Sequence, residues 1–167
     1  MLELKELMLS PPRLTLAVAE SMTCGRIQAR VGAISGASNF FLGGITTYQL
    51  AQKVRHLGVN RTAAEPVNSV SAAVVEQMAR GACELFGSDL GLATTGYAEP
   101  SAEWNVPQPF AWWGLARRRS DGGFVVLSRR VEFPGAPRTQ VQEDVAEAAM
   151  AALIENLRWL RREGRAD

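Results

Sequence analysis

Short apolar segments alternate with helical patterns along this chain, and this alternation constrains its fold more than any other feature. Residues 14–19 read LTLAVA, an almost unbroken apolar run of strand length. Such a run predicts a strand covered on both faces, as in a parallel or mixed α/β sheet. Residues 42–48 (LGGITTY), in which Thr and Ile favour the pleated state, and residues 90–95 (LGLATT) are predicted to form two more strands.

Helices are predicted between these strands, because apolar side chains there recur at helical spacing. The first begins soon after Gly25 and the second covers residues 49–57. The third lies between Ser71, a good N-cap, and Gly87, a common residue at a helix C-terminus. Residues 60–68 contain Pro and Asn and are expected to form a loop.

The second half of the chain predicts a hairpin and a long helix. Residues 110–117 and 124–131 flank the turn sequence SDGG, which indicates an antiparallel pair. Apolar positions between residues 141 and 160 line one face of a final helix. The predicted fold class is therefore α/β, a three-layer-type sandwich with a mixed sheet in the order βαβααβββα. A length of 167 residues suits one domain over residues 1–167, with its core at about 14–160.

Composition excludes several classes of function. Lys+Arg number 18 and Asp+Glu 17, so the net charge is +1 and no basic excess points to nucleic acid. The arginine-rich stretches 117–119, 129–130 and 158–165 are therefore interpreted as solvated faces or subunit contacts. No apolar run approaches the roughly 20 residues that span a bilayer, and the N-terminus lacks a signal-peptide pattern, so a cytoplasmic protein is expected. Two cysteines and the single histidine, His56, exclude a disulfide framework and a multi-His metal site.

A serine stands where the first predicted strand ends. In open α/β sheets, ligands bind at the carboxyl ends of the strands. Ser21 lies there, immediately before a helix whose free N–H groups suit a phosphate or a developing oxyanion. Two interpretations follow from the spacing: Ser21 is a nucleophile, or Ser21 caps the helix, with Thr23 as a second candidate cap.

A serine nucleophile needs a base, and the sequence offers two. His56 lies in a helical stretch and is expected at the solvated surface. Lys53 lies five residues after Tyr48, where the second strand is expected to end, so both can face the sheet edge that carries Ser21. A desolvated lysine can act as a neutral base, with Tyr48 relaying a proton or orienting the serine. The alternative is an exposed helix lysine beside a half-buried strand tyrosine.

The order of these motifs resembles the C-terminal domain of the CinA family, the nicotinamide-mononucleotide deamidases. Residues 19–25 read AESMTCG, where the family has A-E-S-C-T-G-G. Residues 44–48 read GITTY, followed by Lys53 and by LGV at residues 57–59, in the manner of the family's G-x-x-T-Y-x-x-x-x-K and L-G-V elements. Further matches continue to about residue 155 and include Val70, Ser71, Met78, Ala79, Thr95, Gly96, Trp113, Gly114, Leu115, Ala116, Phe133, Gly135 and Arg138.

The resemblance implies hydrolysis of the nicotinamide amide of the mononucleotide, a step of NAD metabolism, without a metal or an organic cofactor. It implies Ser21 as nucleophile, Lys53 as base and Tyr48 as proton relay or orienting group. Backbone N–H groups around residues 22–25 are then candidates for the oxyanion hole. The substrate-binding positions that it implies are Glu20, Thr23, Cys24, Gly25, Thr47, Thr95, Gly96 and Arg138.

Two departures from the family concern phosphate recognition. After Gly96 the family has a glycine-rich loop, whereas this chain has lost those glycines and carries Glu99 and Glu103. Carboxylates at a phosphate site repel a dianion. In addition, Gln142 stands where the family tends to place a second arginine. The same segment brings two aromatic rings, Tyr97 and Trp104, that suit a planar ring or a cation.

Three hypotheses remain open on these residues: a deamidase of the family substrate, an amidase for a non-phosphorylated amide, and an inactive homologue that acts as a binding or structural domain. Cys24, which replaces a family glycine, is read as a small packed residue or as a reactive thiol. The expected partners are a small-molecule substrate and copies of the same chain, with no nucleic acid and no membrane. The resemblance is to the stand-alone form of the family.

Overall fold

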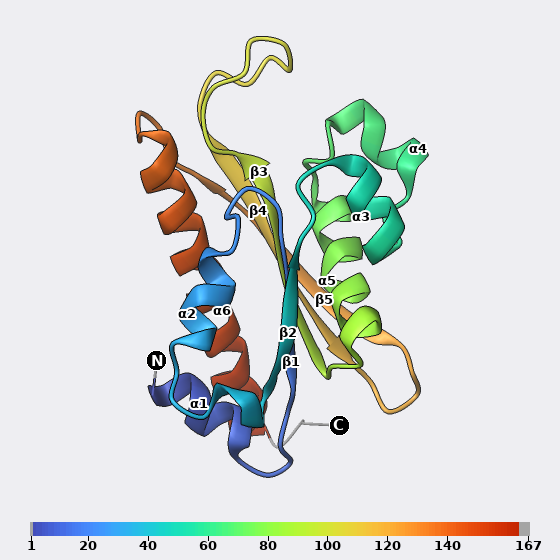
Figure 1. The fold of residues 1–167 in the computed structure, drawn as a ribbon, viewed down its shortest axis with the longest axis vertical. Helices are drawn as coiled ribbons and strands as arrows, with labels where there is room; N and C mark the ends of the chain where they lie inside the picture. Colours follow the sequence, from blue (N-terminus) through green and yellow to red (C-terminus); the bar gives the residue numbers. More distant parts are fainter. Residues whose placement is uncertain (1, 164–167) are drawn as a thin grey trace.

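The computed structural model describes residues 2–163 and places a single five-stranded sheet at the centre of the molecule (Figure 1). The sheet order is β2-β1-β3-β4-β5. The strands are β1 (Leu16–Glu20), β2 (Phe41–Thr46), β3 (Leu90–Tyr97), β4 (Phe110–Arg118) and β5 (Phe124–Glu132). β1 pairs in parallel with β2 and with β3, whereas β4 is antiparallel to both β3 and β5. The predicted mixed sheet and the β4–β5 hairpin are thus confirmed.

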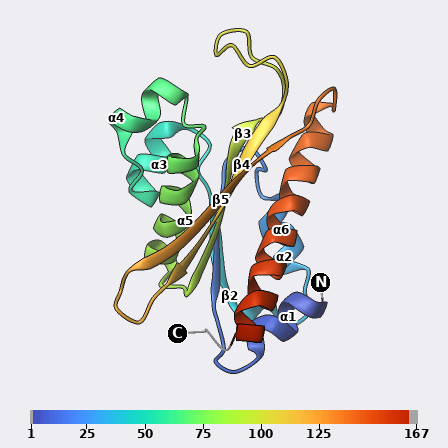
Figure 2. The same cartoon turned by 180° about the vertical axis from the view of Figure 1, so that it is seen from behind.

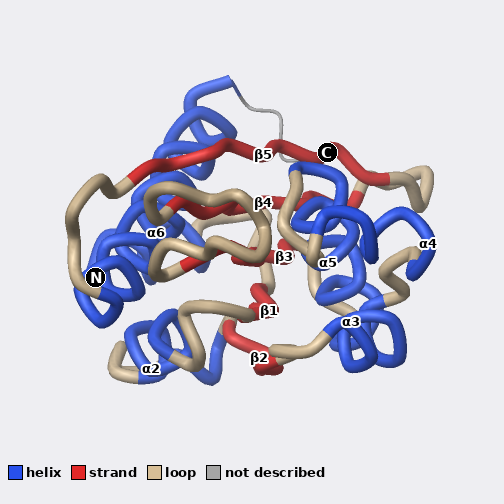
Figure 3. The backbone as a smooth tube through the Cα atoms, turned by 90° about the horizontal axis from the view of Figure 1, so that it is seen from above, coloured by secondary structure: helices blue, strands red, loops and turns tan. Residues whose placement is uncertain are grey.

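Helices cover both faces of the sheet, which gives three layers (Figures 2 and 3). One face carries α1 (Leu2–Leu9), α2 (Arg26–Gly32) and α6 (Arg138–Glu163), and the other carries α3 (Leu50–Leu57), α4 (Arg61–Ala64) and α5 (Ala72–Phe86). Two short 3₁₀ helices, Ala37–Asn39 and Glu65–Val67, complete the list. No helix among residues 2–163 is long and apolar enough to cross a membrane.

The apolar run of β1 is buried on both faces, as its sequence predicts. Leu16 and Val18 point into the core beneath α1, α2 and α6, whereas Ala17 and Ala19 point into the core beneath α5. Successive side chains of a strand alternate between faces, so a strand in the middle of three layers needs apolar residues at every position. The carboxyl ends of the three parallel strands lie at the upper edge of the sheet in Figure 1, where β1 and β2 end side by side and β3 runs on to Tyr97.

Two glycines of the α5 layer set how closely its elements pack. A Cβ on Gly81 would clash with the backbone of Leu57 at the end of α3, and a Cβ on Gly91 would clash with the backbone of Ala79 in α5. Glycine allows these close approaches because it has no Cβ. α5 consequently lies directly against β3, and α3 lies directly against α5, which places α3 beside the upper edge of the sheet.

Most predicted helix ends agree with the structure, and two predictions need correction. Ser71 caps α5 by accepting from Val74, and Gly58 and Gly87 end α3 and α5 in the left-handed region. Residues 60–68 are not a plain loop, because the Asn60 side chain caps the four-residue helix α4 and a 3₁₀ turn follows. β2 ends at Thr46, so residue 48 lies in the loop before α3, outside the strand.

Candidate active site

Ser21 and Lys53 meet at the carboxyl edge of the parallel strands. Ser21 directly follows β1, and its backbone N–H donates to Thr94 O at 3.1 Å, which continues the pairing with β3. Lys53 comes from α3, and its Nζ atom donates to Ser21 Oγ at 2.9 Å. The two side chains are almost fully buried, at 6% and 1% exposure. The structure therefore brings together the serine and the lysine that the sequence places at this edge.

Burial changes the acid–base behaviour of Lys53. Its Nζ atom donates a second hydrogen bond, to the backbone carbonyl of Tyr48 at 2.8 Å, and makes no ion pair with a carboxylate of residues 2–163. Desolvation without a compensating negative charge lowers the pKa of Lys53 from 10.5 to about 8. At neutral pH a fraction of about a tenth then carries a free amine, which can accept the serine proton.

The Tyr48 side chain lies over the pocket and is half exposed. Its hydroxyl accepts a hydrogen bond from Arg138 Nη2 at 2.9 Å, and Arg138 Nη1 in turn pairs with Glu99 Oε1 at 2.6 Å. Three segments that are distant in sequence thus join above Ser21: the loop before α3, the start of α6 and the loop after β3. The contact of the hydroxyl is with Arg138, whereas the backbone carbonyl of the same tyrosine holds Lys53.

Glu20, one of the implied substrate-binding residues, lies away from the pocket and caps α2. Its buried carboxylate accepts hydrogen bonds from the backbone N–H groups of Gly25, Ile27 and Gln28, at 2.9–3.1 Å. This carboxylate satisfies the free N–H groups of the helix N-terminus and complements its dipole. The interpretation of Ser21 as the cap of this helix is therefore wrong, which leaves its hydroxyl available to Lys53.

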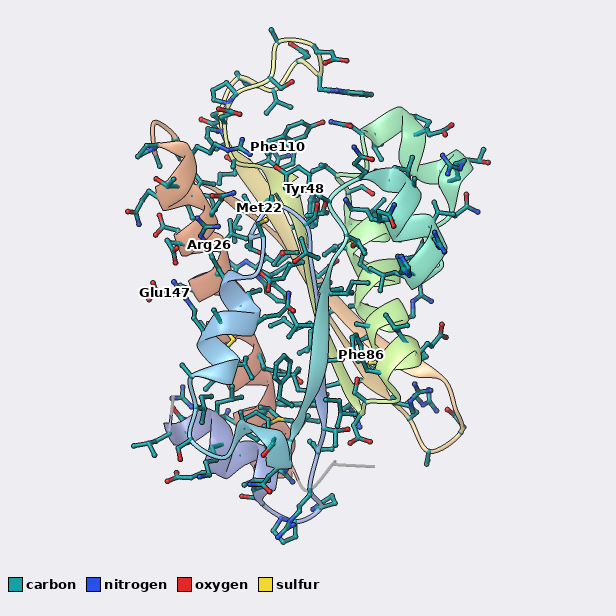
Figure 4. The ribbon with its side chains drawn as sticks, in the orientation of Figure 1. Met22, Arg26, Tyr48, Phe86, Phe110 and Glu147 are labelled. Atoms are coloured by element: carbon teal, nitrogen blue, oxygen red, sulfur yellow. The ribbon has the colours of Figure 1, made fainter. Side chains whose placement is uncertain are left out.

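The turn after Ser21 contains backbone N–H groups with and without a hydrogen-bond partner. The N–H of Cys24 donates to Ser21 O at 3.2 Å, and that of Gly25 is taken by Glu20. The N–H groups of Met22 and Thr23 donate to no other residue in the part of the chain that the structure describes. Met22 lines the pocket and lies beside Tyr48 in Figure 4. These two N–H groups are the candidates for an oxyanion hole.

Gln142 of α6 fixes the orientation of this turn. Its buried Nε2 donates to the carbonyl oxygen of Met22 at 2.8 Å. In a planar trans peptide the C=O and the following N–H point in opposite directions. The hydrogen bond from Gln142 therefore also fixes the direction of the Thr23 N–H. The residue that replaces the second arginine of the family thus anchors the backbone next to the serine.

Cys24, which stands where the family motif has a glycine, adopts a backbone conformation that suits glycine. Cys24 has φ 50° and Gly25 has φ 92°. Cys24 is a free, exposed thiol, so its interpretation as a small packed residue is wrong, and it does not line the pocket as an implied substrate-binding residue would. A left-handed residue with a Cβ costs on the order of 1 kcal/mol relative to glycine. The turn accommodates this cysteine because its side chain is exposed to solvent.

Only some of the threonine and glycine residues that the resemblance implies for substrate binding line the pocket. Thr95 and Gly96 line the pocket, with Thr95 Oγ1 donating to Ser69 O at 2.8 Å. Thr23 is buried below it, where its hydroxyl lies 2.7 Å from that of Thr94. Thr47 is also buried, and its Oγ1 has no hydrogen-bond partner among residues 2–163.

A pocket of about 600 Å³ opens above Ser21. Its lining includes Ser21, Lys53, Thr95 and Gly96 and also residues of the loop after β3, which extends beyond the upper end of the sheet in Figure 1. Part of its wall was not anticipated from the sequence and comprises Gln49, Leu50, Glu65, Asn68, Ser69 and Val70. The available signal was the turn chemistry around residue 68, where Asn68 and Ser69 both adopt positive φ and Asn68 Nδ2 donates to the Tyr97 hydroxyl at 3.1 Å.

Within residues 2–163, no group of three or more His, Cys, Asp or Glu side chains is arranged to hold a metal ion. His56, the other candidate base, lies on α3 with its ring beside Gln52 Oε1 at 3.2 Å. Neither residue lines the pocket. The groups in the pocket that the proposed chemistry can use include the buried serine–lysine pair, backbone N–H groups and the Arg138–Tyr48 pair.

Comparison with known proteins shows which family the chain belongs to. The family model described as "CinA C-terminal domain" matches residues 3–157. A CinA-like protein of Chlorobium limicola is 36% identical over 144 residues, which is 86% of this chain and 33% of that protein. A CinA-like protein of Shewanella sediminis is 37% identical over 129 residues, 77% of this chain and 30% of the relative. The chain thus spans about a third of the length of these relatives.

Solved structures show the same fold. A CinA superfamily protein from Klebsiella pneumoniae has a TM-score of 0.83 and 28% identity, and the match covers 93% of both chains. A competence/damage inducible protein from Agrobacterium tumefaciens has a TM-score of 0.76 and 28% identity, with 92% of both chains covered. The sequence motifs, the serine–lysine geometry and these matches lead to one conclusion: the chain belongs to the CinA C-terminal domain family.

Proposed function

We propose that this chain is an amidohydrolase that cleaves a C–N amide bond of a small molecule, with Ser21 as nucleophile and Lys53 as base. The observation that carries the proposal is the 2.9 Å contact between Lys53 Nζ and Ser21 Oγ, two residues that are almost fully buried. A serine hydroxyl needs an adjacent base to become nucleophilic, and a lysine with a pKa of about 8 supplies one. The resemblance to nicotinamide-mononucleotide deamidases supports an amide substrate.

The first half of the reaction forms an acyl-enzyme. Neutral Lys53 takes the proton of Ser21 Oγ while that oxygen forms a bond to the amide carbon. The carbonyl oxygen becomes negative, and the N–H groups of Met22 and Thr23 stabilise it. Lys53 then gives its proton to the amide nitrogen, the C–N bond breaks, and ammonia leaves the site.

The second half hydrolyses the ester. Lys53, neutral again, takes a proton from a water molecule whose oxygen attacks the ester carbon. When the intermediate collapses, Lys53 returns a proton to Ser21 Oγ and the carboxylic acid product is released. Tyr48 contributes to both halves as a positioning residue, because its backbone carbonyl holds Lys53 Nζ. No other base is required, since the same amine serves each step.

The test is ammonia release from nicotinamide mononucleotide and from nicotinamide riboside by the purified chain and its Ser21→Ala variant. Ser38, an exposed serine that does not line the pocket, gives the matched control Ser38→Ala. We expect ammonia from the wild type and from Ser38→Ala, and a loss of at least 10³-fold in Ser21→Ala. Equal rates in Ser21→Ala would reject the serine mechanism. No release from either amide would favour a binding or structural domain instead.

A further inference from the structure

The arginine that lines the pocket already binds two side chains of the same protein. Arg138 is the one arginine that lines the pocket among the described residues. Its Nη1 pairs with Glu99 Oε1 at 2.6 Å, and its Nη2 donates to the Tyr48 hydroxyl at 2.9 Å. A guanidinium binds a phosphate best through two parallel N–H donors. Here a carboxylate of the same chain takes the place that such an anion would need.

The second cation of the pocket is not available for an anion either. Lys53 donates to Ser21 Oγ and to the backbone carbonyl of Tyr48, and the proposed chemistry needs it as a neutral amine. An anion bound beside Nζ would stabilise the ammonium and remove the base. The reaction and the recognition of a phosphate therefore place opposite demands on this lysine.

Acidic side chains complete the rim. Three acidic residues line the pocket, namely Glu65, Glu99 and Glu103. Two basic residues line it, Lys53 and Arg138. Glu65 pairs with Arg61 outside the pocket and Glu99 pairs with Arg138, whereas Glu103 makes no ion pair with any residue in the described range. A phosphate dianion that entered would thus meet one unpaired carboxylate and one that must give up its partner.

The end of β3 and the loop after it offer aromatic surface. The rings of Tyr97 and Trp104 line the pocket. Tyr97 is held in place by ring contact with Phe110, at a centroid distance of 5.5 Å, and by the hydrogen bond from Asn68 to its hydroxyl. Aromatic faces attract planar rings and cations. This segment therefore combines features that favour a flat, uncharged or positively charged group.

From these contacts we infer that the pocket takes a planar aromatic carboxamide that is neutral or cationic and carries no phosphate, and that Glu99 is the residue that excludes the phosphate. The inference rests on the proposed function, because it is the proposed function that assigns an amide ligand to the pocket. It differs from the substrate of the family in the charge of the ligand. Glu99 acts on binding, by holding Arg138, and it takes no part in the proton transfers at Ser21.

The test compares two amides that differ only by a phosphate group, nicotinamide riboside and nicotinamide mononucleotide. Their dissociation constants are measured by calorimetry on the Ser21→Ala chain, so that turnover plays no role. We expect the riboside to bind at least about tenfold tighter than the mononucleotide. Adding Glu99→Gln frees Arg138, and it should tighten the mononucleotide about tenfold while changing the riboside less than about threefold.

The controls separate a local effect from a general change of charge. Glu103→Gln removes the unpaired rim carboxylate and should help the mononucleotide by a smaller factor, because Glu103 does not hold Arg138, whereas Glu99 does. Glu147→Gln removes a charge from α6 at a position that points away from the pocket (Figure 4), and it should change neither dissociation constant.

The inference is overturned if the mononucleotide binds as tightly as the riboside when Glu99 is present, if Glu99→Gln leaves their ratio unchanged, or if neither compound binds. Ammonia release by the chain with Ser21 intact is scored separately. A clear preference for the riboside without any hydrolysis rejects the proposed function and supports the inference on charge. Hydrolysis with a preference for the mononucleotide supports the function and rejects the inference.

Discussion

Lys53 Nζ lies 2.9 Å from Ser21 Oγ and 2.8 Å from the carbonyl oxygen of Tyr48, in a setting where the lysine is 1% exposed. The amine is therefore aimed at the hydroxyl by two fixed partners and is separated from bulk water. This arrangement has consequences for activity and for stability that can be measured separately.

The activity is expected to depend on pH through Lys53. Only the neutral amine accepts the serine proton, and burial lowers the pKa of Lys53 to about 8, so kcat/KM should rise with pH and level off above about 8. Lys53→Arg, which cannot deprotonate, should lose at least 10²-fold and the alkaline rise. Rates from pH 6 to 10 on the wild type and on Lys53→Arg check this. A flat profile for the wild type would contradict the role of Lys53 as base.

Removing the buried charge is expected to stabilise the fold. The pKa of Lys53 is about 8 in the folded state and close to 10.5 when unfolded, so folding releases a proton between these values. The buried charge of Lys53 therefore lowers the free energy of unfolding of the wild type below pH 8, and this cost disappears as the pH rises toward 10.5. Lys53→Met should gain about 1–3 kcal/mol at pH 7, and the gain should shrink by pH 10. Urea unfolding at both pH values measures it, with Lys5→Met, the other lysine, as control. A gain that is equal at the two pH values would contradict the account.

The cap on α2 is expected to matter for stability. The Glu20 carboxylate accepts three backbone N–H groups and the Gln28 side chain. Glu20→Ala leaves these buried donors without a partner, which should cost about 2–4 kcal/mol. Thermal unfolding checks it against Glu147→Ala, an exposed glutamate of α6. If the two variants unfold alike, the carboxylate is not the cap that the geometry indicates.

Gln142 is expected to act as a positioning residue for the turn after Ser21. Gln142→Leu keeps the size of the side chain but removes the hydrogen bond to Met22 O. Because the Thr23 N–H then loses its fixed direction, kcat should fall about tenfold while KM changes little. Gln140→Leu, at an exposed position of the same helix, is the control. A fall confined to KM would place Gln142 in substrate binding instead.

Gly81 is expected to hold α3, and with it Lys53, in place. A Cβ there meets the backbone of Leu57, so Gly81→Ala should lower stability by about 1–3 kcal/mol and reduce activity. Gly32→Ala adds the same methyl group to a helical glycine with open space around it, and it should be close to neutral. Denaturant unfolding of both variants compares the two sites, and a neutral Gly81→Ala would contradict the packing argument.

The fold could be predicted from the sequence because the signals are local. The apolar run before Glu20, the SDGG turn and the glycines after Leu57 and Phe86 each determine an element within a few residues. The two corrections, at residues 60–68 and at the end of β2, also concern short-range chemistry. A side-chain cap at Asn60 creates one turn of helix in a stretch whose composition alone indicates a loop.

The site could be predicted only in part, because its wall depends on contacts that are remote in sequence. Ser21 and Lys53 follow neighbouring parallel strands, so the sheet edge brings them together. The role of Glu20 as a cap and the anchoring of Met22 by Gln142 depend on helix positions that no spacing rule gives. The pairing of Glu99 with Arg138 likewise joins residues 39 apart.

The central claim is that Lys53 activates Ser21 for nucleophilic attack, and covalent labelling with a small fluorophosphonate tests it without knowledge of the substrate. Intact-protein mass spectrometry follows the adduct with time at several pH values. The account predicts one adduct on Ser21, formed faster as pH rises through about 8, absent in Ser21→Ala and at least 10²-fold slower in Lys53→Arg. An absence of labelling in the wild type, or equal labelling of Ser21→Ala, would contradict it.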